Sequence, residues 1–222
     1  MDAGLAGLHA RPVQSLVLSA LLLALAGCAS TPEELEVFSR SFNPPEEIRV
    51  DGGILKPLSP EHAERDYHAV MANREHLQRT LAWGDWPRAD FTLEQNRRDV
   101  ARHWLEFQGH AGYTYTLLSP DRRRCLGCVY LEPPDPESEV AGARLFFWVA
   151  EEEEAHDLDR RVVAAVLERF GGPQAPLERI VVPILRTNAR GLALAESLGL
   201  QRAGERGERI LFLHRRPPPA AR

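Results

Sequence analysis

Short apolar segments alternate with amphipathic segments along residues 52–216, and this alternation restricts the fold more than any other feature of the chain. Short, mainly apolar runs between turn-forming residues predict strands, and apolar residues at every third or fourth position predict helices. The predicted order is β-α-α-β-β-β-α-β-α-β-β. It indicates an α/β (α+β) domain with a central mixed sheet of about seven strands flanked by about four helices. We expect strands at 54–58, 113–118, 125–131, 143–149, 177–185, 200–206 and 208–214, and helices at 60–81, 92–107, 159–170 and 189–198.

Several predicted helices begin and end at residues that favour helix boundaries. Ser59 is a good N-cap, and Pro60 suits the first helical turn. Thr92 and Gln95 have the spacing of a capping box. Gly199 is suited to end the last helix. These signals make the helix assignments independent of the apolar pattern alone.

The charge balance excludes one large class of function. The chain has 27 Lys and Arg residues against 32 Asp and Glu residues, which gives a formal net charge of −5. Nucleic-acid-binding domains usually carry a basic excess, so we expect no nucleic-acid partner. With 44% apolar and 27% charged residues, the composition is that of an ordinary globular domain. The proline-rich end at 217–222 is expected to be a disordered tail.

The N-terminus resembles the export signal of a bacterial lipoprotein. Arg11 precedes an apolar run at 13–26 that is short for a membrane span but has the length of a signal-peptide core. The run leads into Leu-Ala-Gly-Cys ending at Cys28, which resembles a lipobox. This predicts a signal peptide at 1–27, a lipid anchor on Cys28, a tether at 28–51 and a location at the cell envelope. The alternative is a cytoplasmic protein whose apparent signal is not processed.

The most specific motif spans the last predicted helix. It reads Asn-Ala-Arg-Gly-Leu-Ala-Leu-Ala-Glu-Ser-Leu-Gly-Leu from Asn188 to Leu200. This motif and the strand order resemble the GNAT family of acetyl-CoA-dependent N-acetyltransferases. The resemblance covers residues 52–216 and implies a GNAT-like domain that transfers acetyl from acetyl-CoA to a primary amine of a small molecule or protein. The positions that fit the family pattern are Asn188, Gly191, Leu194, Glu196, Gly199 and Leu200.

The resemblance also implies where the donor binds. In the family, the splayed end of the fourth strand offers backbone N–H groups to the acetyl carbonyl and the pantetheine arm, a role that maps to Val149 and Ala150. The side chain of Asn188 maps to a further donor contact. The segment expected to hold the pyrophosphate departs from the family pattern, because residues 151–161 contain six acidic side chains and no glycine. Arg160 offers some compensating positive charge.

The sequence does not assign a catalytic residue. Many relatives have a tyrosine seven positions after the motif asparagine, and this position is Ala195 here. Candidate general bases are Glu132, at the end of the third strand, and Glu139, just before the fourth. Each is better explained as a solvated loop carboxylate, so neither is assigned a role.

Two tryptophans are candidates for the acceptor site. Trp83 and Trp86 lie in the loop between the first two predicted helices, and this region helps to wall the acceptor site in the family. Indole rings can hold an apolar or a cationic acceptor. The alternative is that both rings cover the edge of the sheet.

A CxxC pattern at Cys125 and Cys128 raises the question of a metal site. Residues three apart on a regular strand point to opposite faces. No further Cys or His residues are spaced to complete a set of four ligands. We therefore expect two buried strand cysteines and no metal.

Two functions from different classes follow from these observations. The first is a GNAT-like N-acetyltransferase. The second is a non-catalytic GNAT-fold lipoprotein that binds a ligand or partner at the cell envelope. The motif at Asn188 favours the enzyme. The apparent export signal and the glycine-free segment favour the second, because acetyl-CoA is a cytosolic metabolite.

Overall fold

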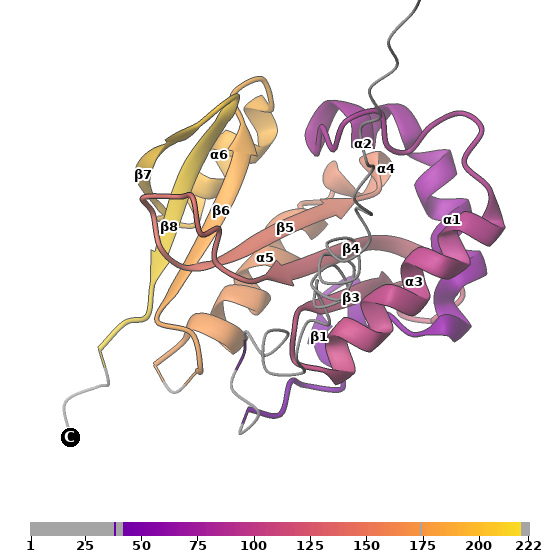
Figure 1. Ribbon diagram of the computed structural model, residues 1–222, viewed down its shortest axis with the longest axis horizontal. Coiled ribbons are helices and arrows are strands. Elements are labelled where there is room, and N and C mark those ends of the chain that lie inside the picture. The colour runs from indigo at the N-terminus through magenta and orange to yellow at the C-terminus, as the bar shows by residue number, and fades with distance from the viewer. Residues whose placement is uncertain (1–37, 39–41, 174, 219–222) are drawn as a thin grey trace, which may run out of the picture. The chain divides into compact units, whose positions relative to one another are not determined.

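The computed structural model describes residues 38, 42–173 and 175–218, which form a mixed sheet with helices on both faces (Figure 1). The strands are β1 Ile48–Val50, β2 Gly53–Pro57, β3 Tyr113–Leu118, β4 Cys125–Glu132, β5 Ala143–Val149, β6 Arg179–Leu185, β7 Gln201–Arg206 and β8 Arg209–Arg215. The helices are α1 Ala63–Ala72, α2 Arg74–Thr80, α3 Leu93–Gln108, α4 Glu151–Glu154, α5 Leu158–Gly171 and α6 Ala189–Ser197, preceded by a 3-10 turn, η2, at Pro60–His62. The predicted fold class is confirmed, with eight strands in place of about seven.

The eight strands form one sheet in the order β1-β2-β3-β4-β5-β6-β8-β7. Every neighbouring pair is antiparallel except β5 and β6, which are parallel. The single parallel pair joins an N-terminal meander to a C-terminal β6-β8-β7 unit. The predicted hairpin at the C-terminus is confirmed by β7 and β8.

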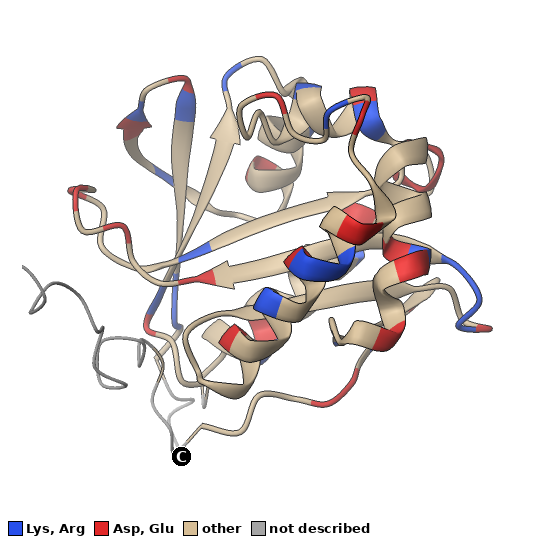
Figure 2. Cartoon of the chain, turned by 45° about the vertical axis from the view of Figure 1, so that its right-hand side comes forward, with Lys and Arg blue, Asp and Glu red and all other residues tan. Residues whose placement is uncertain are grey.

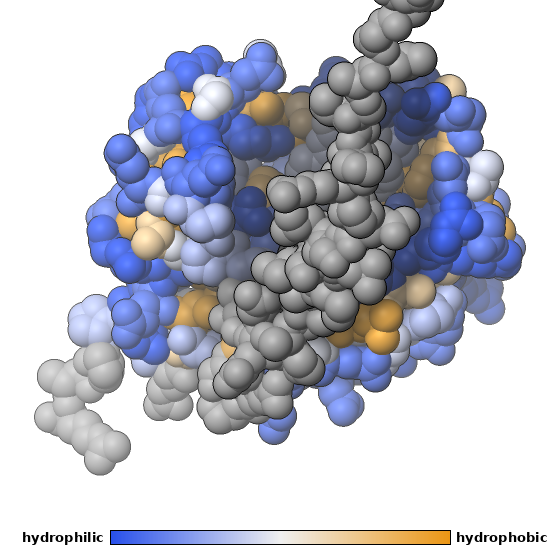
Figure 3. All heavy atoms as spheres, in the orientation of Figure 1, coloured by the Kyte–Doolittle hydropathy of each residue, from blue (hydrophilic) through white to orange (hydrophobic). Residues whose placement is uncertain are grey.

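The two faces of the sheet pack against different helices. Phe146 and Trp148 of β5 lie in a buried cluster with Leu77 of α2. Leu145 and Val149, which alternate with them along the strand, lie in the larger cluster that includes Val162 of α5. Side chains of successive strand residues point to opposite faces, so β5 separates the side of α1 and α2 from the side of α5 and α6. On the face shown in Figure 3, the visible surface is largely hydrophilic, with scattered apolar residues between the polar ones.

The domain begins earlier than expected, which corrects part of the predicted tether at 28–51. Ile48 pairs with Leu55 in the ladder between β1 and β2. The Phe38 ring lies 4.7 Å from that of Tyr113 and is buried. Strand β1 pairs with the edge of β2, which would otherwise leave backbone groups unpaired. Phe38 covers the ring of Tyr113, which would otherwise expose apolar area to water.

Other predictions for the termini fall partly outside the described residues. The signal peptide at 1–27 and Cys28 are not described. Among the described residues, no helix is both long and apolar enough to cross a membrane. The tail at 217–222 is described only as far as residue 218, and these two residues are in neither a helix nor a strand.

The parallel pair β5–β6 stays together only at its beginning. Ala143 pairs with Ile180 and Arg144 with Val181, and no further pairs follow. Arg186 N–H donates to Glu208 O of the chain leading into β8. Backbone groups alternate in direction along a strand. The backbone N–H and C=O groups of the even-numbered residues of β6 therefore point toward β8, and those of the odd-numbered residues point toward β5.

Pro183 is one of these odd-numbered residues. A proline has no N–H to donate, so the ladder between β5 and β6 loses a bond just where the strands separate. The result is an open wedge between the C-terminal halves of the two strands.

A β-bulge in β4 bends the sheet next to this wedge. Leu117 pairs with Gly127 but Leu118 pairs with Cys125, so Leu126 is an extra residue in β4. A Cβ on Gly127 would lie 2.2 Å from the Trp148 carbonyl oxygen. Glycine therefore permits the close approach of β4 and β5.

Replacing Gly127 with alanine should lower the free energy of unfolding by at least about 2 kcal/mol, because the opposing atom is backbone and cannot rotate away. Urea denaturation measures the change. The control is Gly207→Ala in the β7–β8 turn, where φ is +54° and no atom lies within 4 Å of the added Cβ. That change should cost about 1 kcal/mol through backbone strain alone. Equal losses in the two variants would contradict the close approach.

Candidate functional site: the wedge between β5 and β6

The wedge gathers side chains from six helices and strands, α2, β5, α4, α5, β6 and α6. The space left between these side chains is about 30 Å³, enough for about two water molecules. The wedge is therefore narrow in this structure. Its polar lining consists of His76 and Thr80 from α2, Glu154 from α4, Asp159 from α5, and Asn188 and Arg190 at the start of α6.

Asn188 both lines the wedge and begins α6. Its side-chain oxygen accepts the backbone N–H of Gly191 at 2.8 Å, which caps the helix. A Cβ at Gly191 would lie 2.9 Å from both Asn188 Nδ2 and Ile184 Cγ2. The glycine thus allows α6 to lie close to β6 and keeps the asparagine amide at the wedge.

The two backbone donors predicted at the end of β5 are not equivalent. The Ala150 N–H donates to Leu126 O at 2.8 Å, so it is already bonded to β4. Because N–H groups alternate in direction along a strand, the Val149 N–H points to the open edge. Of the two amides, Val149 is the one positioned for a ligand in the wedge, and its role stays a prediction.

The acidic segment at 151–159 is largely paired with arginines from other elements. Glu151 contacts Arg79 of α2 at 2.9 Å. Glu152 and Glu153 contact Arg124 at 3.0 and 2.6 Å. Acidic and basic residues mix over these helices in Figure 2 instead of forming areas of one sign. The paired arginines therefore reduce the electrostatic repulsion that the six acidic side chains of this segment would exert on a phosphate group.

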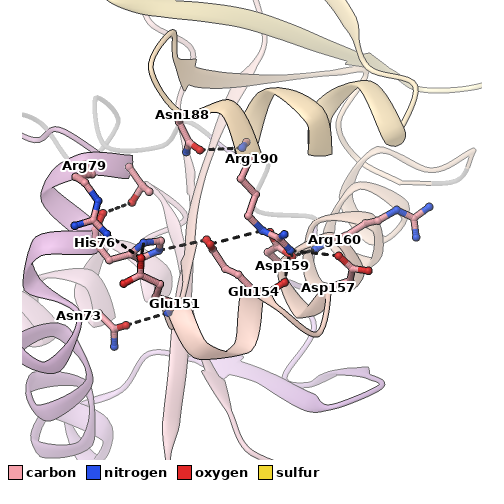
Figure 4. A network of polar contacts seen from close by, with 12 residues as sticks. Asn73, His76, Arg79, Glu151, Glu154, Asp157, Asp159, Arg160, Asn188 and Arg190 are labelled. Carbon is pink, nitrogen blue, oxygen red and sulfur yellow. Dashed lines mark hydrogen bonds and ion pairs between the residues drawn. The ribbon is translucent and has the colours of Figure 1, made fainter.

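Arg190 and Asp159 form the central ion pair of the wedge (Figure 4). Nε and Nη2 of Arg190 donate to the two carboxylate oxygens of Asp159, each at 2.8 Å. The Asp159 side chain is only 3% exposed. The hydrogen bonds that Arg190 donates to the Asp159 carboxylate raise the pKa of the Arg190 guanidinium. Arg190 also donates to the Glu154 carbonyl.

The same carboxylate occupies the beginning of α5. Asp159 Oδ1 accepts the backbone N–H of Arg160 at 2.9 Å. Helix N-termini attract anions, and here the chain supplies its own anion. The Arg160 side chain is exposed and points away from Asp159 and Arg190 in Figure 4. Of the predicted donor-site residues, Asn188 lines the wedge. Val149 is related to it only through the direction of its backbone N–H, and the Arg160 side chain points elsewhere.

His76 was not recognised from the sequence. It is 4% exposed, and its Nε2 lies 3.3 Å from Glu154 Oε1. The geometry gives this buried nitrogen no hydrogen bond among the described residues. No local sequence pattern identifies His76 as a residue of the wedge, because its neighbour Glu154 is far away in the chain.

Trp83 and Trp86 lie together on the face of β5 that packs against α1 and α2, with ring centroids 5.8 Å apart. Trp83 also meets Tyr130 and Phe146 edge to face, at 5.1 and 5.6 Å. Phe146 in turn lines the wedge. The two tryptophans are therefore adjacent to the wedge, separated from it by the side-chain layer of β5.

Of the candidate bases, Glu132 lines a cavity of about 420 Å³. It contacts Arg144 at 2.8 Å. Burial raises the pKa of Glu132, although Arg144 acts in the opposite direction. Glu139 is exposed in the connection between β4 and β5. Ala195 is buried in α6 and provides no hydroxyl group.

Residues 54–201 match the family model described as "Acetyltransferase (GNAT) domain". The chain belongs to the GNAT acetyltransferase family. The family prediction is thereby confirmed, and the assignment supports an N-acetyltransferase. No curated protein matches the sequence significantly.

Solved structures with the same fold include three acetyltransferases. A RimL ribosomal L7/L12 alpha-N-protein acetyltransferase in complex with coenzyme A has a TM-score of 0.63 and 18% identity, covering 77% of this chain and 98% of its own. A ribosomal-protein-S5-alanine acetyltransferase from Vibrio fischeri has a TM-score of 0.62 and 16% identity, with 76% and 96% covered. The microcin C7 self-immunity acetyltransferase MccE, in complex with acetyl-CoA and AMP, has a TM-score of 0.62 and 15% identity, with 78% and 97% covered.

The cysteine pair of this GNAT chain departs from the sequence prediction. Cys125 and Cys128 are buried, as expected. The prediction that they point to opposite faces is wrong, because the extra residue Leu126 reverses the alternation. Their sulfur atoms and a carboxylate oxygen of Asp66 lie within 4.8 Å of one another. Among the described residues this group offers three potential metal-ligating atoms, whereas structural zinc sites use four.

Arg190→Gln should destabilise this GNAT domain, because Asp159 would remain as a buried carboxylate without its two-fold partner. The Arg190 side chain is 39% exposed, so we expect a loss of about 1–3 kcal/mol rather than that of a fully buried pair. Urea denaturation at pH 7 measures it. The control Arg186→Gln breaks an exposed pair with Glu205 and should cost less than about 1 kcal/mol. The double change Arg190→Gln with Asp159→Asn should recover part of the loss, and additive losses would contradict the pair.

Proposed function

We propose that the protein is an acetyl-CoA-dependent N-acetyltransferase that acetylates a primary amine. The observation that carries this proposal is the open edge of β5 opposite Asn188, on a chain of the GNAT family. Two of the similar structures are named as complexes with coenzyme A or acetyl-CoA. The acceptor is an amine of a protein or a small molecule, and the ribosomal-protein acetyltransferases among the similar structures support an amine acceptor.

The wedge fits one part of acetyl-CoA better than another. The Val149 N–H at the open edge and the Asn188 amide are donors suited to the polar groups of the pantetheine arm. At the phosphate end, the first turn of α5 already holds the Asp159 carboxylate. Arg190 is the cation that lines the wedge and the residue suited to a phosphate. The Asp159 carboxylate competes for it.

Acetyl-CoA supplies the acetyl group as an activated thioester. The chain must orient an amine next to it and keep that amine unprotonated. Glu132 is the candidate to accept the proton, because it lines a cavity together with Trp83 and Tyr130 and burial raises its pKa. Its ion pair with Arg144 holds the carboxylate in place.

Asn188→Asp tests the donor site without removing the helix cap. Aspartate keeps the oxygen that accepts the Gly191 N–H and replaces the amide donor by a negative charge. We expect an unchanged melting temperature and an affinity for acetyl-CoA that falls about tenfold or more. Isothermal titration calorimetry measures the affinity. Asn43→Asp, the same change at an exposed residue outside the wedge, is the control. Equal affinities in the two variants would remove Asn188 from the donor site.

The non-catalytic alternative is favoured by one observation. The Asp159–Arg190 pair closes the phosphate end of the wedge and leaves only about 30 Å³ free. A folded wild-type protein that shows no heat of binding with acetyl-CoA, at low or high salt, would support this alternative and overturn the proposed enzyme.

We also propose that the protein is attached to a membrane of the cell envelope through a lipid on Cys28. The support is the lipobox-like sequence at the end of an apolar run. Radiolabelled palmitate should label the wild type and not Cys28→Ala, and the variant should be released from the membrane fraction. The buried Cys125→Ala is the control and should be labelled like the wild type. A wild type without label would instead support the cytoplasmic location.

A further inference from the structure

A second cavity, of about 160 Å³, lies between α1, α3, β4 and the loop that carries the two tryptophans. A cavity of about 150 Å³ in another protein holds a molecule of the size of benzene. This space is therefore large enough for a short alkyl chain with one polar end. Its lining includes Asp66, Trp83, Trp86, Asn96, His103 and Tyr130.

The carboxylate of Asp66 lies at this cavity and has no cationic partner among the described residues. It is 5% exposed. Its Oδ2 accepts from Asn96 at 2.9 Å, and its Oδ1 accepts from the Cys128 thiol at 3.2 Å. Burial raises the pKa of Asp66. A buried carboxylate without a cation is costly to ionise, and an ammonium group in the cavity would remove that cost.

The walls of the cavity suit a cation with an alkyl chain. Trp83 and Trp86 lie side by side, and Tyr130 meets Trp83 edge to face. Indole and phenol rings attract ammonium groups through their faces and cover methylene groups through apolar contact. An aromatic wall next to a buried carboxylate is thus complementary to an alkylammonium ion and not to an anion.

The surrounding charges point the same way. A neighbouring cavity of about 420 Å³ shares Trp83, Arg102, His103 and Tyr130 with the first. The two arginines that line the pair of cavities are Arg102 and Arg144, and the four carboxylates are Asp66, Asp99, Glu106 and Glu132. Arg102 is paired with Glu106 and Arg144 with Glu132, so Asp66 and Asp99 are the two carboxylates of these cavities without an arginine partner among the described residues. Negative cavity walls concentrate cations.

We propose that the Asp66 cavity binds an alkylammonium group of the acceptor, which makes the acceptor an amine with a second cationic nitrogen. The identification of this amine as the acceptor rests on the proposed N-acetyltransferase activity. The presence of a cation-binding site at Asp66 does not depend on it. Phe146 contacts Trp83 and also lines the wedge. A flexible chain anchored at Asp66 thus has its free amine on the side of β5 that faces the donor.

The first test is binding of n-butylamine and of 1-butanol to the full-length protein without acetyl-CoA, followed by calorimetry and tryptophan fluorescence. The amine should bind about tenfold or more tightly than the alcohol, because only the ammonium meets Asp66. Asp66→Asn should remove this preference. The variant should remain folded, since it removes a buried charge that has no cationic partner, and thermal unfolding checks this.

The matched control is Glu64→Gln, which removes the same charge from an exposed position of α1. It should bind n-butylamine like the wild type. A second variant, Trp83→Leu, should weaken amine binding severalfold while retaining the preference over the alcohol. Equal binding of amine and alcohol, or equal amine binding by Asp66→Asn and the wild type, overturns the site.

The second test separates this inference from the proposed activity. With acetyl-CoA present, Asp66→Asn should raise the KM for 1,4-diaminobutane about tenfold or more and leave kcat nearly unchanged, since Asp66 positions the acceptor without touching the reacting amine. A lower kcat with an unchanged KM contradicts the inference. If the amine binds but no acetyl transfer occurs, the cation site stands and the enzymatic proposal fails. Comparison with Nα-acetyl-lysine amide shows whether the alkylammonium comes from a free diamine or from a lysine side chain.

Discussion

The end of the β5–β6 ladder after Arg144 and Val181 is the constraint on which the site depends. Parallel strands that diverge leave backbone groups without partners, which is unfavourable unless water or a ligand satisfies them. Two local features support the divergence. Pro183 lacks the N–H that would extend the ladder, and the bulge at Leu126 bends β4 beside it. The C-terminal half of β5 thereby has a free backbone edge although the strand lies in the middle of the sheet.

Ion pairs fill the wedge that the separation of β5 and β6 leaves open. Six acidic side chains follow β5, and three arginines, from α2, the β3–β4 loop and α6, meet most of them. Most of these pairs are exposed and contribute little individually. Arg190 with Asp159 is different, because the carboxylate is buried and its two oxygens are both bound. Under the proposed function, a phosphate of the donor would compete with this carboxylate for Arg190.

The sequence predicted the parts of the fold that depend on local patterns. Strand and helix order, the hairpin at the C-terminus and the motif at Asn188 arise from residues that are near one another in the chain. Strand β1 was missed because three residues are too few to show alternation. The orientation of Cys125 and Cys128 was wrong because a bulge changes the alternation without changing the composition. The Arg190–Asp159 pair joins residues 31 positions apart, and no pattern in one sequence identifies such a pair.

The division of β5 between two faces explains how donor and acceptor can meet. Its odd-numbered side chains pack toward α5, its even-numbered ones toward α1 and α2, and its free backbone edge lies between. A donor at the edge can therefore be approached from the face that carries Trp83 and the Asp66 cavity. Phe146 forms the boundary between the two spaces. Since the same strand supplies the edge and the boundary, a change in the β4 bulge would move both sites together.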